Sequence, residues 1–121
     1  MEYLTPQEEE AMLIIWRLGN GFIKDMLEQY PKPRPPYTTL ASTVKNLERK
    51  GYVNSRRYGN TYEYTPAVCE KEYKKQFMSG FVKDFFRNSY SELVTFFARE
   101  QRISADELKD IISIIEKQQT P

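Results

Sequence analysis

Apolar residues recur with helical spacing along the start of the chain. In residues 6–18 the apolar positions that share one face are Ala11, Met12, Ile15, Trp16 and Leu18. A stripe of this kind is typical of a helix that buries one side. Thr5 is suited to cap this helix, and Glu8 three residues later completes a capping box. The run Gly-Asn-Gly at 19–21 ends the segment, so the pattern predicts a helix over 6–18.

Two further helical segments follow, separated by prolines. Residues 22–30 are amphipathic and predict one extended residue and then a short helix at about 23–30. Four prolines within 31–36 exclude helix there and form a stiff connector. A third helix is predicted over 38–50, ending at Gly51, with an inward stripe of Leu40, Val44 and Leu47.

The opposite face of the third predicted helix is small, polar and basic. It carries Thr38, Thr39, Ser42, Asn46 and Arg49, flanked by Lys45 and Lys50. Side chains of these types reach base edges and phosphates when a helix enters the major groove of DNA. The alternative is an ordinary solvated helix surface. For a helix considered by itself, this pattern favours that alternative.

A β-hairpin follows directly. Residues 52–58 and 61–65 are rich in β-forming residues and alternate around a Gly59-Asn60 turn. Three helices and then a hairpin is the order of elements in a winged helix-turn-helix. The residues that we expect to contact a phosphate backbone from this wing are Arg56, Arg57, Tyr58 and Asn60. The alternative is an exposed hairpin whose tyrosines only pack across the strands.

After Pro66 the apolar residues change in kind, because most of them are aromatic. Helices are predicted over 67–87, 91–99 and 105–118. Three short helices do not easily bury such a surface alone, so we expect a second copy of the chain to cover it. The residues expected at this dimer interface are Phe77, Phe81, Phe85, Phe86, Leu93, Phe97, Leu108, Ile111, Ile112 and Ile115. Two alternatives remain open: these helices fold back on the winged domain, or their aromatic side chains line a ligand pocket.

The predicted fold class is therefore mainly α with a small β-hairpin. Residues 1–67 are expected to form an N-terminal winged helix-turn-helix that binds DNA. Residues 68–121 are expected to form a C-terminal helical dimerisation domain. A dimer would place two recognition helices one DNA turn apart, or a multiple of it.

The distribution of charge supports this division. The net charge is only +1, which excludes a uniformly basic surface. Residues 32–58, however, carry seven bases and one acid, whereas residues 1–31 carry six acids and two bases. Because the local field decides where a phosphate backbone docks, the basic stretch that includes the third helix and the hairpin is the expected contact.

Composition excludes several other functions. The chain has no His and a single Cys, Cys69, so an intrachain disulfide and Ser-His or Cys-His catalysis are impossible. We expect no metal, no cofactor and no enzyme activity, and we expect Cys69 to be a buried structural thiol rather than a redox switch. The sequence has no signal-peptide pattern and no apolar run long enough for a membrane span, which predicts a cytoplasmic protein.

Two functional hypotheses follow from the residues. The first is a homodimeric transcriptional repressor that binds double-stranded DNA. The second is a winged-helix module that binds another protein without DNA, which the low net charge keeps open.

Several stretches of the chain match a known family. They are Leu4–Glu9, Ile14–Trp16, Thr38–Leu40, Leu47–Val53, Tyr62–Pro66 and Leu93–Ala98. In these stretches the chain resembles the penicillinase-repressor family of the BlaI, MecI and CopY type over almost its full length. The resemblance implies a dimeric winged-helix repressor on a palindromic operator, in some members an operator of antibiotic-resistance genes.

The resemblance also implies how the repressor is released from DNA. At some of the positions concerned, this chain differs from the family. Many members are cleaved within the short C-terminal helix by a membrane sensor metalloprotease, at a bond that falls on Phe96-Phe97 here, with Phe96 in place of the usual Asn. The copper-responsive branch has a C-terminal Cys cluster that this chain lacks. Positions that are often basic in the family's recognition helix are Ala41 and Asn46 here, so the operator sequence does not carry over from relatives.

Overall fold

The computed structural model describes residues 2–119 and divides the chain into two compact units. The first unit ends at Lys74 and the second begins at Lys75. The first unit therefore takes in the start of helix α4 (Glu70–Phe85). The functional boundary that the sequence suggests after residue 67 stays a prediction.

Helix α1 (Pro6–Leu18) matches the predicted helix at both ends. The Glu8 amide donates to Thr5 Oγ1 at 3.2 Å, and the Thr5 amide donates to Glu8 Oε1 at 2.9 Å. This reciprocal capping box satisfies amides that have no partner within the helix. At the other end Gly19 takes a φ of 84°, a left-handed conformation that glycine adopts without a steric penalty.

Helix α2 (Ile23–Glu28) is shorter than the predicted helix over 23–30, and α3 (Tyr37–Arg49) begins one residue earlier than predicted. Pro31 disfavours helical backbone at the residue before it, which ends α2 early. The Arg34 guanidinium then donates to the carbonyl oxygens of Glu28 and Tyr30, both at 3.4 Å, and so satisfies groups at the end of α2.

The buried core of the first unit lies between α1, α2, α3 and the sheet. The inward stripe that the sequence predicts for α3 is fully buried, with Leu40, Val44 and Leu47 at 2% exposure or less. Met12 and Ile15 of α1 and Met26 of α2 pack in the same cluster. This core fixes which face of α3 points away from the protein.

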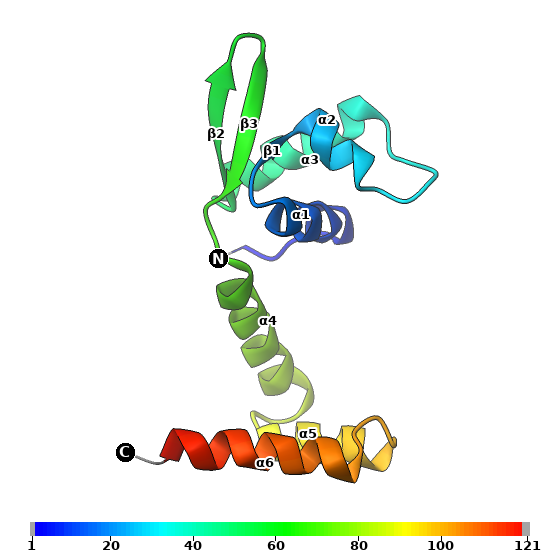
Figure 1. Ribbon diagram of the computed structural model, residues 1–121, viewed down its shortest axis with the longest axis vertical. Coiled ribbons are helices and arrows are strands. Elements are labelled where there is room, and N and C mark those ends of the chain that lie inside the picture. The colour runs from blue at the N-terminus through cyan, green and yellow to red at the C-terminus, as the bar shows by residue number, and fades with distance from the viewer. Residues whose placement is uncertain (1, 120–121) are drawn as a thin grey trace. The chain divides into compact units, whose positions relative to one another are not determined.

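Three antiparallel strands complete the first unit. They are β1 (Gly21–Phe22), β2 (Val53–Tyr58) and β3 (Thr61–Pro66), in the order β1-β3-β2. The predicted hairpin is confirmed, and the single extended residue expected before α2 is a two-residue strand paired to β3. The hairpin of β2 and β3, which we call the wing, reaches well beyond α1–α3 in Figure 1.

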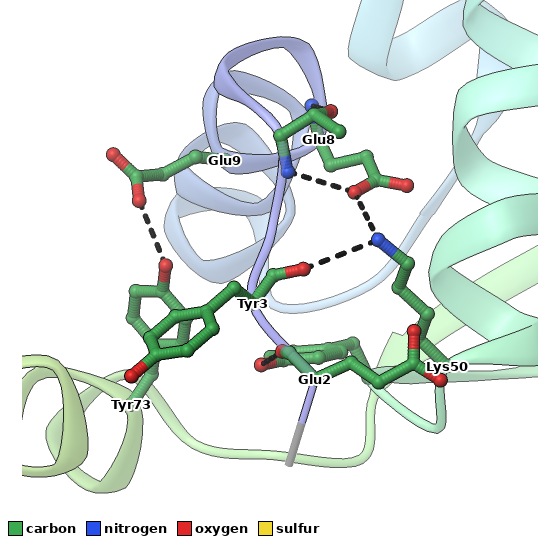
Figure 2. A network of polar contacts seen from close by, with 8 residues as sticks. Glu2, Tyr3, Glu8, Glu9, Lys50 and Tyr73 are labelled. Atoms are coloured by element: carbon green, nitrogen blue, oxygen red, sulfur yellow. Dashed lines mark hydrogen bonds and ion pairs between the residues drawn. The ribbon is translucent and has the colours of Figure 1, made fainter.

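Polar contacts hold the chain termini of this unit in place (Figure 2). The Tyr73 hydroxyl donates to Glu9 Oε2 at 2.7 Å, and the Trp16 indole N–H donates to the Val68 carbonyl at 2.8 Å. The Tyr52 hydroxyl donates to the carbonyl of Glu2 at 2.6 Å. These contacts attach the N-terminal segment and the start of α4 to the winged domain.

Helix α4 starts at Glu70 rather than at residue 67 as predicted, and its last residue is Phe85. The Ala67 and Val68 amides both donate to the Tyr52 carbonyl, which holds residues 67 and 68 outside the helix. At the other end Arg87 and Asn88 take positive φ angles of 53° and 63°. Left-handed backbone at two successive residues ends the helix.

The second unit contains the rest of α4 and helices α5 (Tyr90–Arg99) and α6 (Ala105–Gln119), which confirms the predicted helices over 91–99 and 105–118. Ser104 and Glu107 exchange side-chain and backbone hydrogen bonds of 3.1 Å at the start of α6. Among residues 75–118, whose side chains are described, only Val82 is buried. The second unit therefore has almost no core of its own.

Candidate nucleic-acid interface

The outward face of α3 is as the sequence predicts. All six residues expected to contact DNA from this helix are exposed, namely Thr38, Thr39, Ser42, Lys45, Asn46 and Arg49. Because Leu40, Val44 and Leu47 hold the opposite side in the core, the exposed face has a fixed orientation. The two charged side chains among the six, Lys45 and Arg49, form no ion pair with the described part of the chain.

Lys50 does not belong to this face, although the sequence suggests that it flanks it. Its Nζ lies 2.6 Å from Glu8 Oε1 and 3.2 Å from the carbonyl oxygen of Tyr3 (Figure 2). Burial opposes ionisation of Glu8, but the hydrogen bonds from Lys50 and Thr5 and the Lys50 charge outweigh it and lower the pKa of that carboxyl. The positive charge of Lys50 is therefore used inside the protein.

The two wing arginines project to opposite faces of the hairpin. Residues paired across an antiparallel ladder share a face. Arg57 pairs with Tyr62, and Ser55 on the same side donates a hydrogen bond to Glu48 of α3. Arg56 pairs with Glu63 on the other side, and its guanidinium lies 5.3 Å from the Tyr58 ring. Of the two arginines, only Arg57 thus lies on the face of the hairpin that meets α3.

The tip of the wing is a tight turn. Gly59 takes a φ of 59°, and the Arg57 Nε donates to the Gly59 carbonyl at 2.8 Å. Arg57, Tyr58 and Asn60 are all exposed there. Arg57 is therefore held close to the turn, where a wing contacts a phosphate backbone.

A groove separates α3 from the wing, and we call it the α3–wing groove. It consists of two adjoining hollows of about 200 and 410 Å³. Lys45, Tyr62 and Tyr64 line both hollows. The residues that line one of the two are Phe22, Ile23, Lys24, Tyr37, Ala41, Glu48, Arg49, Ser55, Asn60 and Thr61.

Tyr37 and Tyr64 line this groove together with Tyr62, although the sequence does not place Tyr37 or Tyr64 at the expected DNA-contacting surface. Strand alternation puts Tyr62 and Tyr64 on one face of β3, and Tyr37 lies four residues before Ala41 on the side of α3 that faces the groove. The alternation of β3 in the sequence already indicates that Tyr62 and Tyr64 share one face of the strand. What the sequence does not reveal is that α3 lies over this face of the wing.

The family of the chain follows from a comparison with known proteins. A family model described as Penicillinase repressor matches residues 4–117. The chain belongs to the penicillinase repressor family.

Relatives within this family are distant but match along most of their length. The Penicillinase repressor of Bacillus licheniformis is 22% identical over 115 residues, which cover 94% of this chain and 90% of that protein. The Methicillin resistance regulatory protein MecI of Staphylococcus aureus (strain N315) is 23% identical over 116 residues, 94% of each chain. The structure of the transcriptional regulator PA4135 covers 98% of this chain and 80% of that chain at 17% identity and a TM-score of 0.43. The winged-helix assignment rests on the elements described above.

The second unit of this penicillinase-repressor family chain exposes a large apolar surface. Phe85 is 72% exposed, and Ile112 and Ile115 of α6 are about half exposed. Of the other residues expected at the dimer interface, Phe77, Phe97 and Ile111 are exposed, whereas Phe81, Phe86, Leu93 and Leu108 are half-buried. Phe81 contacts Phe77, Phe85 and Phe86, so the aromatic residues form a connected row.

Three other sequence expectations concern Cys69, a metal site and a membrane-spanning helix. Cys69 is exposed, so the expectation of a buried thiol is wrong. It lies between Val68 and the first residue of α4, where its side chain faces solvent. Within residues 2–119 no three Cys, Asp or Glu side chains converge as metal ligands, and no helix is both long and apolar enough to cross a membrane.

Proposed function

We propose that this chain is a DNA-binding transcriptional repressor that acts as a homodimer on a palindromic operator. The observation that carries the proposal is the exposed polar face of α3 beside the wing, in a chain of the penicillinase repressor family. The face is small enough to enter a major groove, and its orientation is fixed by the core beneath it.

The six exposed residues of α3 divide into two roles. Thr38, Thr39, Ser42 and Asn46 carry hydroxyl or amide groups that hydrogen-bond to base edges. Lys45 and Arg49 lie toward the wing side of the face, since both line the α3–wing groove, and they neutralise phosphates. Base reading and backbone contact are thus assigned to different parts of one helix.

The wing supplies the second contact with DNA. Arg57 and Asn60 lie at the tip on the side of α3 and hold the backbone of the adjacent groove. Arg56 and Tyr58 lie on the opposite side of the hairpin and make secondary contacts with the DNA backbone from there. With α3 in the major groove, the wing is placed over the flanking minor groove.

Dimerisation is assigned to the second unit. Its helices expose phenylalanine and isoleucine side chains while burying only Val82 among residues 75–118. Apolar surface on this scale is covered in a stable protein, and twofold dimers are the most frequent assembly. A symmetric pair of recognition helices then matches a palindromic operator.

Release from DNA is assigned to cleavage between Phe96 and Phe97 by a membrane sensor metalloprotease. Both side chains are exposed in α5 of the single chain, although Phe97 is also expected at the dimer interface. Co-expression with such a protease, followed by intact-mass measurement, tests this part. A chain that stays uncut overturns it and leaves repression unaffected.

The test of the proposed function is selection of bound duplexes from a random pool, followed by binding measurements at about 50 mM salt. A repressor of this type enriches a palindromic sequence and also binds random duplex weakly at low salt. A variant with Thr38, Ser42 and Asn46 changed to Ala should lose enrichment, whereas Lys109→Ala in α6 is the matched surface control. Absence of all DNA binding would overturn the proposal and favour a protein-binding module.

A further inference from the structure

We propose that the α3–wing groove is a seat for one phosphate of the DNA backbone, held by the hydroxyls of Tyr64 and Tyr62 and the ammonium of Lys45. This inference rests on the proposed DNA-binding function and extends it to two uncharged residues, Tyr62 and Tyr64. Lys45, Tyr62 and Tyr64 are the three residues that line both hollows of the groove.

Tyr64 forms the floor of the groove. Its side chain is only 4% exposed, yet its hydroxyl has no hydrogen-bond partner among residues 2–119. The hydroxyl is not sealed off either, since no fully enclosed side-chain atom of the described residues lacks a partner. Buried polar groups almost always have partners. A hydroxyl without a partner on a buried ring that lines a groove is therefore a candidate donor to a ligand in that groove.

The protonation of Tyr64 suits a donor. Burial raises the pKa of its hydroxyl, and the charge of Glu48 raises it further. The phenol is therefore fully protonated at neutral pH and offers its O–H to an anion. Tyr62, on the same face of β3, is 43% exposed and forms one wall of the groove beside Lys45.

The geometry of a duplex brings a backbone strand to this place. When a recognition helix lies in the major groove and a wing lies over the adjacent minor groove, the strand between the two grooves passes between helix and wing. Tyrosine hydroxyls and lysines are among the side chains that bind DNA phosphates. The strand that enters the α3–wing groove meets Tyr62 and Lys45 at its wall and Tyr64 at its floor.

The charges around the groove agree with an anion at this position. Lys24 lies at the smaller hollow and Arg49 at the larger one. Glu48 is the one carboxylate among the residues that line the two hollows. It lines the larger hollow, where it accepts a hydrogen bond from the Ser55 hydroxyl. The phosphate is thus expected at the shared wall and toward the smaller hollow, away from Glu48.

The experiment compares Tyr64→Phe with the wild type on a selected duplex. Phe keeps the buried ring, so only the hydroxyl is lost, and thermal melting checks that the variant folds. Tyr30→Phe is the matched control, because Tyr30 is also buried in the first unit but lines a different pocket. We expect Tyr64→Phe to weaken binding by about tenfold, the value typical of a hydrogen bond to a charged group. Tyr30→Phe should bind as the wild type does.

Neutral methylphosphonates placed one at a time along one half-site identify the phosphate. In the wild type, neutralising the seated phosphate should weaken binding. In Tyr64→Phe the loss at that one position should shrink by about tenfold, while losses at other positions stay unchanged. Lys45→Met should couple to the same position and also lower the salt slope by about one unit.

The outcomes separate the two proposals. If the wild type binds duplexes but Tyr64→Phe binds equally well, or couples to no single phosphate, the seat is wrong and the DNA-binding function stands. If the wild type binds no duplex, the proposed function fails and the seat fails with it. If inorganic phosphate alone binds tightly and Tyr64→Phe loses only that binding, the groove is a site for a free anion and the assignment to DNA is overturned.

Discussion

The Lys50 ammonium lies 2.6 Å from the Glu8 carboxylate, across 42 residues of sequence. The pair joins the first turn of α1 to the end of α3, the helix that carries the proposed DNA-contacting face. Both side chains are nearly buried, with 11% and 6% exposure. A buried pair of this kind contributes little by itself, but a single partner left behind is costly.

Lys50→Met should therefore lower the free energy of unfolding by about 2–3 kcal/mol, because it leaves a buried carboxylate without its cation. Urea denaturation measures the change. The double variant Glu8→Gln, Lys50→Met should recover part of the loss. Lys74→Met is the matched control, since Lys74 pairs with Glu70 at 3.5 Å on the surface and should change stability by less than about 0.5 kcal/mol. Equal effects of the two lysine changes would contradict the prediction.

The same pair predicts a pH dependence of stability. The pKa of Glu8 is lowered from its ordinary 4.5 in the folded protein. The unfolded chain therefore binds the proton more tightly, and the stabilisation by ionised Glu8 is complete above about pH 5 and lost as the pH falls through the folded pKa. The difference in unfolding free energy between the wild type and Glu8→Gln should stay constant from pH 7 to about 5 and shrink below 4.5. A difference that grows on acidification would reverse the sign and refute the assignment.

Arg57→Ala should weaken binding to any duplex and lower the slope of log affinity against log salt by about one unit. The reason is that Arg57 shares a face with α3, whereas Arg56 pairs with Glu63 on the other side of the hairpin. Arg56→Ala should therefore have the smaller effect. Fluorescence anisotropy between about 50 and 200 mM salt measures both slopes. An unchanged slope in Arg57→Ala would remove the wing from the interface.

Asn46→Ala should alter sequence preference while leaving the salt slope unchanged, because an amide contacts base edges and carries no charge. Selection from a random pool should show relaxed preference at one or two positions in each half-site. Asn54→Ala is the control, since Asn54 is exposed on the face of the wing turned away from α3. The same enriched sequence from Asn46→Ala as from the wild type would exclude Asn46 from base reading.

Phe85→Asp should dissociate the proposed dimer. Phe85 is 72% exposed and adjoins the aromatic row, with its ring 5.0 Å from that of Phe81. A carboxylate buried at the centre of an apolar interface should raise the dimer dissociation constant by at least about 30-fold. Sedimentation equilibrium measures it, with Tyr3→Asp as the control, because Tyr3 is 78% exposed in the first unit. A wild type that sediments as a monomer, or a variant that stays a dimer, would contradict the proposal.

The sequence predicts the elements of this fold well because their signals are local. Thr5 and Glu8 lie three residues apart, and their capping box fixes the start of α1. The stripe of Leu40, Val44 and Leu47 likewise fixes the inner face of α3. Such signals need no knowledge of what packs where.

The candidate site is less predictable because its decisive contacts are distant in sequence. On a helical wheel Lys50 borders the outward face, and only the position of Glu8 in three dimensions draws it inward. The alternation of β2 shows that Arg56 and Arg57 differ in face, but not which face meets α3 until the Ser55–Glu48 contact is known. Tyr64 looks like an ordinary strand tyrosine until α3 is placed above it.

Trp16 is the one tryptophan of the chain, and its indole donates to the carbonyl of Val68, two residues before the start of α4. The tilted ring of Tyr73 lies 5.4 Å from it. The protein thus contains a single tryptophan, whose fluorescence can be excited apart from that of the nine tyrosines, at the point where α4 leaves the winged domain. Its emission colour and lifetime report, without any label, whether the start of that helix is docked.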